Sequence, residues 1–261
     1  MPSSIDNLET PKNLLGVFCD IDDTLTIDGR LVPGCLDQMV QAQARGLAIV
    51  PITGRPGGWV DHIARAWPVD GVVGENGGLW AWMDGTKMQR RFLQDETTRR
   101  SNRKRLDILA KRILSAVPGT ALASDQAYRD LDLAIDFCED VPPLPDESID
   151  AIVEAFKTAG AECKVSSIHV NGWYGAFDKL VGVEQFHLDR WGSPIDYSRW
   201  AFFGDSANDE PMFRAFPASI GVANVRDFLP RMDHHPTWIT KAPGGEGFIE
   251  GMKLLLAQPH S

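Results

Sequence analysis

Three short apolar segments of this chain each end in residues with acidic or hydroxyl side chains, and this arrangement constrains the fold more than any other feature. A continuous apolar run of this length is typical of a strand buried on both faces, as in a parallel sheet. Because the carboxyl ends of parallel strands meet at one edge of the sheet, we expect these polar residues to lie close together. The segments and the residues that follow them are 14–19 with Asp20 and Asp22, 47–52 with Thr53, and 200–203 with Asp205.

Helical patterns alternate with these segments, as in an α/β domain. The apolar spacing predicts helices over 36–44 and 59–67 and a third strand over 71–73. Strand–helix–strand order predicts a Rossmann-like parallel sheet with right-handed connections. The same order resumes late in the chain, with a helix over 178–190 and a strand over 219–222.

Between these two parts the order of elements changes. A hairpin, a long helix over 97–116, a strand over 131–137, a second helix over 148–158 and one or two strands within 163–170 predict an inserted α+β domain. A chain of 261 residues is longer than one average domain and shorter than two, which fits a core with a smaller insert. The boundaries that we expect are 1–82 and 173–261 for the core and 83–172 for the insert.

The composition restricts the kinds of partner. Lys and Arg number 26 against 36 Asp and Glu, and the formal net charge of −10 argues against a nucleic-acid or anionic-membrane partner. The chain has no run of about 18 apolar residues, and its first residues lack the pattern of a signal peptide. Its four cysteines show no C-x-x-C spacing, and the apolar surroundings of Cys19 predict buried, reduced thiols in a cytoplasmic protein without zinc.

If the strand ends converge, the carboxylates of Asp20, Asp22, Asp205 and Asp209 come within a few ångströms of one another. Two like charges 4 Å apart repel by about 4 kcal/mol at an effective dielectric constant near 20, so a cation must lie among them. Oxygen ligands that incompletely surround the ion suit Mg²⁺. Alternate side chains of an extended strand point the same way, so Asp20 can attack while Asp22 transfers a proton.

A phosphate monoester is a dianion, so its charge must be neutralised before a carboxylate can approach it. Thr53 offers a hydroxyl for this purpose, and Lys179 offers an ammonium at the start of a predicted helix. Simpler roles remain open: each of these residues, and Asp209 in particular, is also suited to a turn, a helix cap or a solvated helix face. Arg55 equally well binds phosphate or begins a helix.

Four motifs of this sequence resemble those of the haloacid dehalogenase-like superfamily and follow one another in the same order along the chain. The first and the fourth are specific, whereas the second and the third are single residues that gain weight from their order. Within the superfamily, an acid at position 22 is typical of phosphatases and phosphomutases rather than dehalogenases or ion-pumping ATPases. The matching motifs are Asp20-x-Asp22-x-Thr24, Thr53, Lys179 and Gly204-Asp205-x-x-Asn208-Asp209.

The resemblance implies a role for each matching residue. Asp20 would form an aspartyl-phosphate, and Asp22 would protonate the leaving oxygen and then activate water. Mg²⁺ would be held by Asp20, the Asp22 carbonyl and Asp205, with Asp209 in the metal shell. The residues that would bind the phosphoryl group are Thr53, Gly54, Arg55, Lys179 and Asn208.

The insert resembles the C2-type cap, subtype B, of sugar-phosphate enzymes, a subclass (IIB) that includes Cof-like and sucrose-phosphatase-like phosphatases. Glycine-rich turns at 74–78 and 244–248 are similar to turns in those enzymes. We therefore expect a Mg²⁺-dependent phosphatase for a small-molecule phosphate monoester, a phosphorylated sugar or polyol, with Asn76, His169 and Asn171 as candidate substrate contacts. A phosphomutase of the phosphomannomutase type and a non-catalytic phosphate-sensing module are the alternatives. The sequence carries no signal of oligomeric state.

Two further features allow two interpretations each. The basic stretch 87–112 either attracts anionic substrates or forms a solvated helix face. Trp80, Trp82 and Trp173 flank the expected boundaries of the insert, where they either stack on a sugar or pack in a core.

Overall fold

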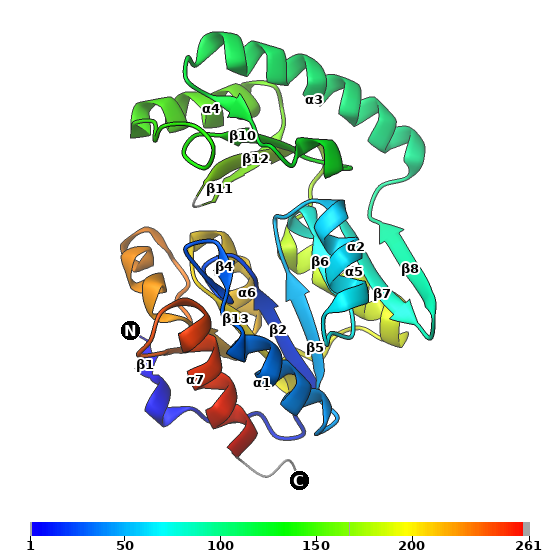
Figure 1. Cartoon of the computed structure of the whole chain (residues 1–261), viewed down its shortest axis with the longest axis vertical. Helices are drawn as coiled ribbons and strands as arrows, with labels where there is room; N and C mark the ends of the chain where they lie inside the picture. Colours follow the sequence, from blue (N-terminus) through cyan, green and yellow to red (C-terminus); the bar gives the residue numbers. More distant parts are fainter. Residues whose placement is uncertain (1, 167, 258–261) are drawn as a thin grey trace.

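The computed structural model describes residues 2–166 and 168–257, which form a larger and a smaller layered part (Figure 1). The larger part holds a sheet with the strand order β1-β15-β14-β13-β2-β5-β6-β7-β8. Neighbouring strands from β1 to β6 are parallel, and the β6–β7 and β7–β8 pairs are antiparallel. The strands are β1 (Ser3–Ser4), β2 (Gly16–Asp20), β5 (Ala48–Ile52), β6 (Val72–Gly74), β7 (Leu79–Asp84), β8 (Lys87–Phe92), β13 (Trp200–Gly204), β14 (Ala218–Gly221) and β15 (Trp238–Ile239). The predicted α/β class with a mainly parallel central sheet is confirmed.

Strand β2 shows why the central strands are apolar along their whole length. Val17 and Cys19 belong to the hydrophobic cluster on one face of the sheet, and Phe18 belongs to the cluster on the other. The parallel register places Phe18 beside Phe202 of β13 and Val50 of β5, so each face is a continuous apolar layer. Both faces must therefore be covered by helices.

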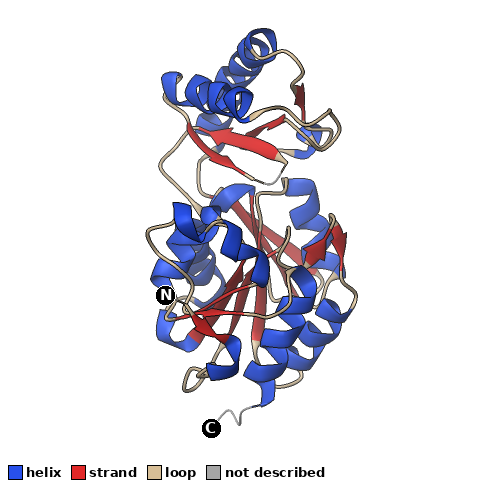
Figure 2. Ribbon diagram, turned by 90° about the vertical axis from the view of Figure 1, so that its left-hand side faces the viewer, coloured by secondary structure: helices blue, strands red, loops and turns tan. Residues whose placement is uncertain are grey.

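Helices cover the two faces, as Figure 2 shows from the side. Buried residues of three helices join the Val17 cluster, and buried residues of two others join the Phe18 cluster. The first three helices are α1 (Gly34–Gln43), α2 (Gly57–Ala66) and α7 (Gly244–Ala257), and the other two are α5 (Lys179–Trp191) and α6 (Glu210–Ala215).

The smaller part, which we call the cap, contains an antiparallel sheet with the order β11-β12-β10-β9 and two helices. Val170 packs with Phe156 in the cluster between the cap sheet and its helices. The sheet of the cap faces the core (Figure 1). His169 and Asn171 alternate with Val170 along β12 and line a cavity whose other lining residues include Asp20 and Lys179 of the core. The elements are α3 (Glu96–Ala116), β9 (Ala121–Leu122), β10 (Leu133–Asp136), α4 (Asp146–Thr158), β11 (Glu162–Val165) and β12 (His169–Trp173).

The structure moves the first boundary of the insert. The hairpin that we placed from residue 83 onward belongs to the large sheet, because β8 pairs with β7 from Leu79↔Phe92 to Asp84↔Lys87. Antiparallel strands often extend the edge of a parallel sheet. The change in the order of elements after residue 82 therefore did not mark the end of the core. A second hairpin, β3 (Thr26–Ile27) with β4 (Arg30–Leu31), was not predicted because its strands are too short to show alternation.

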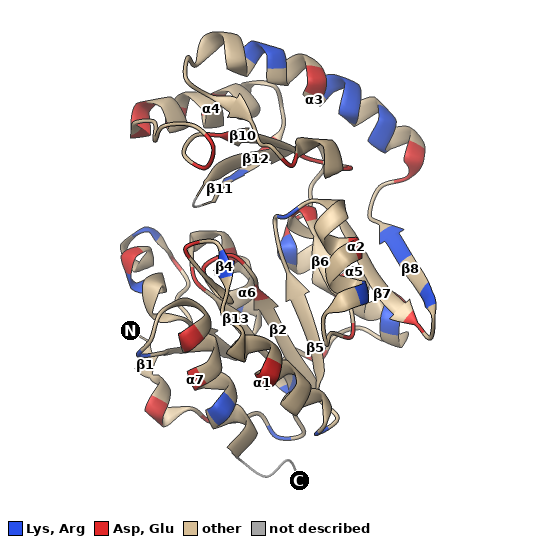
Figure 3. Cartoon of the chain, in the orientation of Figure 1, with Lys and Arg blue, Asp and Glu red and all other residues tan. Residues whose placement is uncertain are grey.

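The structure also decides between the open interpretations. Trp80, Trp82 and Trp173 are buried in the hydrophobic clusters, which favours core packing over sugar stacking. The basic residues of α3 lie along the outer side of the cap (Figure 3), and Arg100 forms an i,i+4 pair with Glu96, as on a solvated helix face. All four cysteines are free, and Cys19 is buried. Among the described residues, no helix combines the length and the apolarity that crossing a membrane requires.

Candidate active site

Asp20 is the last residue of β2 and lies at the carboxyl edge of the large sheet. Lys179 Nζ donates a hydrogen bond of 2.9 Å to Asp20 Oδ1 and one of 2.7 Å to Asp209 Oδ1. Lys179 is the first residue of α5, and its N-cap Asp178 accepts a hydrogen bond from the backbone N–H of Val181. The N-cap hydrogen bond of Asp178 fixes where α5 starts. This start places Lys179 beside Asp20, which is 159 positions away in the sequence.

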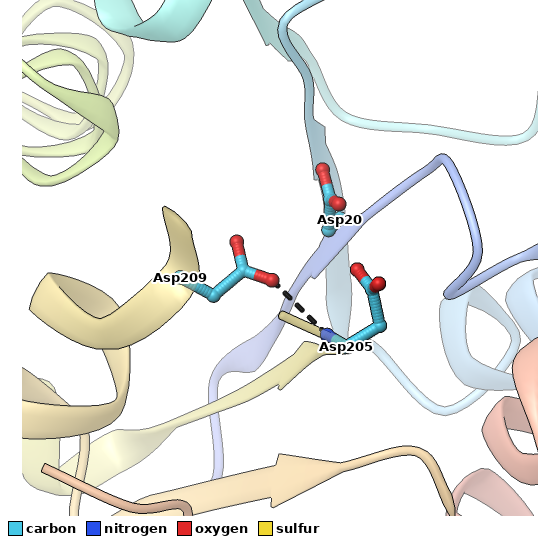
Figure 4. Close-up of side chains that lie close together, drawn as sticks. All are labelled: Asp20, Asp205 and Asp209. Atoms are coloured by element: carbon cyan, nitrogen blue, oxygen red, sulfur yellow. Dashed lines mark hydrogen bonds between the residues drawn. The ribbon is translucent and has the colours of Figure 1, made fainter. Parts of the chain in front are cut away.

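Asp205 and Asp209 complete a compact acidic cluster with Asp20 (Figure 4). Asp209 Oδ2 accepts a 3.0 Å hydrogen bond from the backbone N–H of Asp205, which closes the turn after β13. Thr24 Oγ1 donates to Asp205 Oδ1 at 3.3 Å. One carboxylate oxygen from each aspartate lies within 4.8 Å of the others. Asp209 therefore caps a turn and also belongs to the acidic cluster, while its binding of a metal remains a prediction.

Burial and mutual repulsion perturb the ionisation of these groups. Burial raises the pKa of Asp20 to about 7, an effect that Lys179 opposes and that Asp209 and Asp22 increase. Burial, together with Asp209 and Asp20, raises the pKa of Asp205 well above its ordinary value. Burial alone would lower the pKa of Lys179, but the attraction of Asp20 and Asp209 outweighs it and the net shift is upward. The ammonium therefore stays charged at any physiological pH.

These charges fit a divalent cation. When all are ionised, the three buried carboxylates exceed the charge of Lys179 by two negative charges. Carboxylate oxygens are the ligands that Mg²⁺ prefers, and a divalent ion would cancel this excess. Asp20, Asp205 and Asp209 are thus the residues that could hold it.

Asp22 does not join this cluster, and our expectation that four carboxylates gather in one place is wrong for its side chain. Strand β2 ends at Asp20, so Asp22 lies in the following turn. Its carboxylate accepts hydrogen bonds from Arg55 Nε at 3.1 and 3.2 Å and from Nη2 at 2.9 Å. The side chain is 32% exposed and faces the same cavity as Asp20. The guanidinium thus holds the second acid beside the cluster rather than inside it.

The residues expected to bind phosphate lie around this edge. Thr53 directly follows β5 and is fully buried, and its Oγ1 accepts a hydrogen bond of 2.9 Å from the backbone N–H of Arg55. Gly54 and Asn208 line the cavity, and Asn208 Oδ1 lies 3.5 Å from Lys179 Nζ. Gly54, Arg55, Lys179 and Asn208 therefore line the cavity together, whereas Thr53 is not among its lining residues. Their roles in binding remain predictions.

A cavity of about 520 Å³ lies between this edge and the cap. The cap contributes His169 and Asn171 to its wall, and the core contributes Asn76. That these three residues contact the substrate remains a prediction. Asn171 Nδ2 donates to Asp132 Oδ2 at 3.0 Å and to Gly54 O at 3.3 Å. Burial lowers the pKa of His169, although Glu139 Oε2 lies 2.9 Å from its Nε2 and acts in the opposite direction.

A network of charged residues across the cavity was not predicted from the sequence. Arg129 forms ion pairs with Asp125 and Asp132, both at 3.0 Å, and donates to Gly54 O at 2.9 Å. Arg55 reaches Asp125 at 3.9 Å and Glu139 at 3.6 Å. In the sequence, these residues appear only as charged positions on either side of β10, and local patterns cannot show that two of them pair with Arg55.

The cap also contacts the core through Glu75, another residue that we did not predict. Its carboxylate is fully buried and accepts hydrogen bonds from four backbone N–H groups, of which one belongs to Gly57 and three to cap residues 130–132. Burial, with Asp132, raises the pKa of Glu75 to about 7 against the effect of these bonds.

Comparison with known proteins supports one architecture. No family model and no curated protein matches the sequence. A solved structure from Thermoplasma acidophilum matches with a TM-score of 0.71 at 19% identity, covering 94% of this chain and 99% of the other. A HAD/COF-like hydrolase from Plasmodium vivax matches with a TM-score of 0.68 at 18% identity, covering 94% and 96%.

The chain therefore has the haloacid dehalogenase-like fold. The sucrose-phosphatase of Synechocystis, solved with sucrose and phosphate, shares this fold with a TM-score of 0.63 at 16% identity, and covers 94% of this chain and 98% of its own. Because the aligned shares are nearly complete in both directions, the similarity includes the cap as well as the haloacid dehalogenase-like core. At these identities the similarity establishes the fold.

Proposed function

We propose that this protein is a Mg²⁺-dependent phosphatase that hydrolyses a small phosphorylated sugar or polyol through an aspartyl-phosphate. The observation that carries the proposal is the buried cluster in which Lys179 touches Asp20 and Asp209 while Asp205 completes the acidic set. A phosphomonoester could enter the cavity above it, and Asp22 lies on the wall of that cavity. The fold comparisons support the proposal because neighbours with the same architecture include sugar phosphatases.

The first chemical step transfers the phosphoryl group to the enzyme. An oxygen of Asp20 forms a bond to phosphorus while the bond to the leaving oxygen breaks, and protonated Asp22 gives its proton to that oxygen. The ammonium of Lys179 is already within hydrogen-bond distance of Asp20, so it would also neutralise the incoming phosphoryl oxygens. An alcohol leaves, and Asp22 is left as a carboxylate.

The second step reverses these roles. Asp22 takes a proton from water, the water oxygen forms a bond to phosphorus, and the acyl-phosphate bond breaks to release inorganic phosphate and free Asp20. Arg55 donates to both oxygens of Asp22 and so orients this carboxylate toward the cavity when it acts as the base of the second step. Mg²⁺ would supply charge neutralisation between the nucleophile and the dianionic ester.

The cavity supports the proposed substrate class. A volume of about 520 Å³ is in the range of small-molecule sites and suits a sugar-sized leaving group. Its wall offers the polar side chains of Ser166, His169 and Asn171 beside the apolar Ile168. Hydroxyl-rich molecules with apolar ring faces match this mixture.

Release of inorganic phosphate from a panel of phosphorylated sugars, polyols and an aryl phosphate in Mg²⁺ tests the proposal. We expect turnover that disappears in Asp20→Asn and persists in the surface variant Asp150→Asn. Near-normal turnover in Asp20→Asn would refute the assigned nucleophile. Dependence on a bisphosphate activator without net phosphate release would identify a phosphomutase, and metal binding without any turnover across the panel would favour a phosphate-sensing module.

A further inference from the structure

The turn at residues 74–78 has an unusual backbone. Glu75 and Asn76 adopt φ angles of 44° and 55°, which place two consecutive residues with side chains in the left-handed region. Such conformations are costly for residues other than glycine and persist only where the surrounding structure holds them. The contacts of Glu75 and Asn76 must therefore hold this turn.

Glu75 is held by the cap. Its Oε1 accepts hydrogen bonds from the backbone N–H of Gly57 at 2.9 Å and of Asp130 at 2.8 Å. Its Oε2 accepts from Leu131 at 2.6 Å and Asp132 at 3.2 Å. Four donors on one carboxylate fix the side chain, so the conformation of the turn depends on the docked cap.

The same turn contacts both elements that carry the proposed phosphate ligands. The backbone N–H of Asn76 donates to Thr53 O at 3.2 Å, and that of Glu75 donates to Arg55 O at 3.1 Å. Gly77 packs against the start of α5, where an added Cβ would lie 2.0 Å from the carbonyl oxygen of Asp178, the residue before Lys179. The turn thus lies between the cap, the loop after β5 and the lysine helix.

Asn76 has an unused donor at this position. The residue is only 5% exposed, and its Nδ2 is buried without a hydrogen-bond partner. It lines the same cavity as Asp20 and Lys179, and its carboxamide lies against Gly54, where an added Cβ would be 3.2 Å from Asn76 Oδ1. A buried amide without a partner is rare in folded proteins, and an oxygen of a ligand bound in this cavity would supply the missing acceptor.

We propose that Asn76 is a further substrate-binding residue, whose carboxamide donates a hydrogen bond to an oxygen of the phosphoryl group, and that Glu75 is the positioning residue that holds it there while the cap is docked. The inference rests on the proposed function only in taking the ligand to be a phosphate ester. Docking of the cap would then set the position of the Asn76 carboxamide at the phosphoryl site through the turn at residues 74–78.

Binding of inorganic phosphate in Mg²⁺, measured by calorimetry, tests Asn76 without requiring turnover. Asn76→Gly removes the carboxamide and suits the left-handed backbone, so the melting temperature should not fall. We expect its Kd for phosphate to rise about 10- to 100-fold, the loss expected for a hydrogen bond to a charged group, and kcat/KM to fall by a similar factor. Asn13→Gly is the matched control, because Asn13 has the same φ of 55° and is exposed outside the cavity.

The outcomes separate this inference from the proposed function. Weaker phosphate binding in Asn76→Gly supports the inference even in a protein that hydrolyses no ester, which would refute the phosphatase alone. Unchanged phosphate affinity in Asn76→Gly, or no phosphate binding by the native protein, would overturn the inference.

A double-mutant cycle with Glu75→Gln tests the positioning role. Gln keeps the size of Glu but loses its charge, so its bonds to the cap backbone weaken and the turn is released. If Glu75 acts through Asn76, the double variant should bind phosphate no more weakly than Asn76→Gly by itself. Additive losses would show that Glu75 does not position Asn76 and would overturn that half of the proposal.

Discussion

Replacing Asp20 by asparagine should abolish activity and, in the metal-free protein, raise stability. The carboxylate is buried beside Lys179 and Asp209, and its pKa is raised from 3.8 to about 7, an effect to which the nearby charge of Asp22 adds. This shift of about three pKa units corresponds to about 4 kcal/mol at 1.36 kcal/mol per unit, which is the cost of keeping Asp20 ionised in the fold. Asparagine has the same shape and no charge, so it removes this cost.

The sign of the effect sets its pH dependence. A carboxyl group whose pKa is raised by folding contributes stability below its unfolded pKa, and this contribution is lost as the pH rises through the folded pKa. The advantage of Asp20→Asn should therefore be absent near pH 4, grow between pH 4 and 7, and be complete at pH 8. At about 2–4 °C per kcal/mol, the melting temperature at pH 8 should rise by about 8–16 °C.

Thermal unfolding in a chelator at pH 5 and at pH 8 measures this difference, with Asp150→Asn as the control. Asp150 is exposed on α4, so its replacement should leave the melting temperature unchanged at both pH values. Saturating Mg²⁺ should stabilise the native protein, by about 2.7 kcal/mol at a hundred times its Kd, and narrow the gap to Asp20→Asn. An equal or lower melting temperature for Asp20→Asn at pH 8 in the chelator would refute the reasoning.

Three further predictions concern the metal, Arg55 and Trp80. Mg²⁺ should raise the melting temperature of the native protein in a thermal scan but not that of Asp205→Asn, and an equal rise in both would argue against a site at Asp205. Arg55→Ala should lower kcat/KM about 10- to 100-fold, because Asp22 loses its bidentate partner and the cap loses two ion pairs; Arg55→Lys should recover little of this, and full recovery would show that charge alone suffices. Trp80→Phe removes the 2.9 Å hydrogen bond to Asp189, so the melting temperature should fall by a few degrees while KM stays unchanged. A raised KM would instead indicate that Trp80 stacks on the substrate.

The sequence alone was sufficient for the features that local patterns encode. Buried strands require apolar residues on both faces, so the runs before Asp20, Thr53 and Asp205 revealed the central strands. Parallel topology requires their carboxyl ends to meet, which is why the sequence alone predicts that Asp20 and Asp205 lie together, as the structure shows.

Only the tertiary structure decided which charges pair. The partners of Asp22, Glu75 and Arg129 come from distant segments, and neither helical nor strand periodicity records such contacts. Placing β8 in the large sheet likewise depended on strand pairing, because an antiparallel hairpin has the same local pattern in either domain. Periodicity reports which face of an element is buried, whereas the identity of the partner depends on how the whole chain packs.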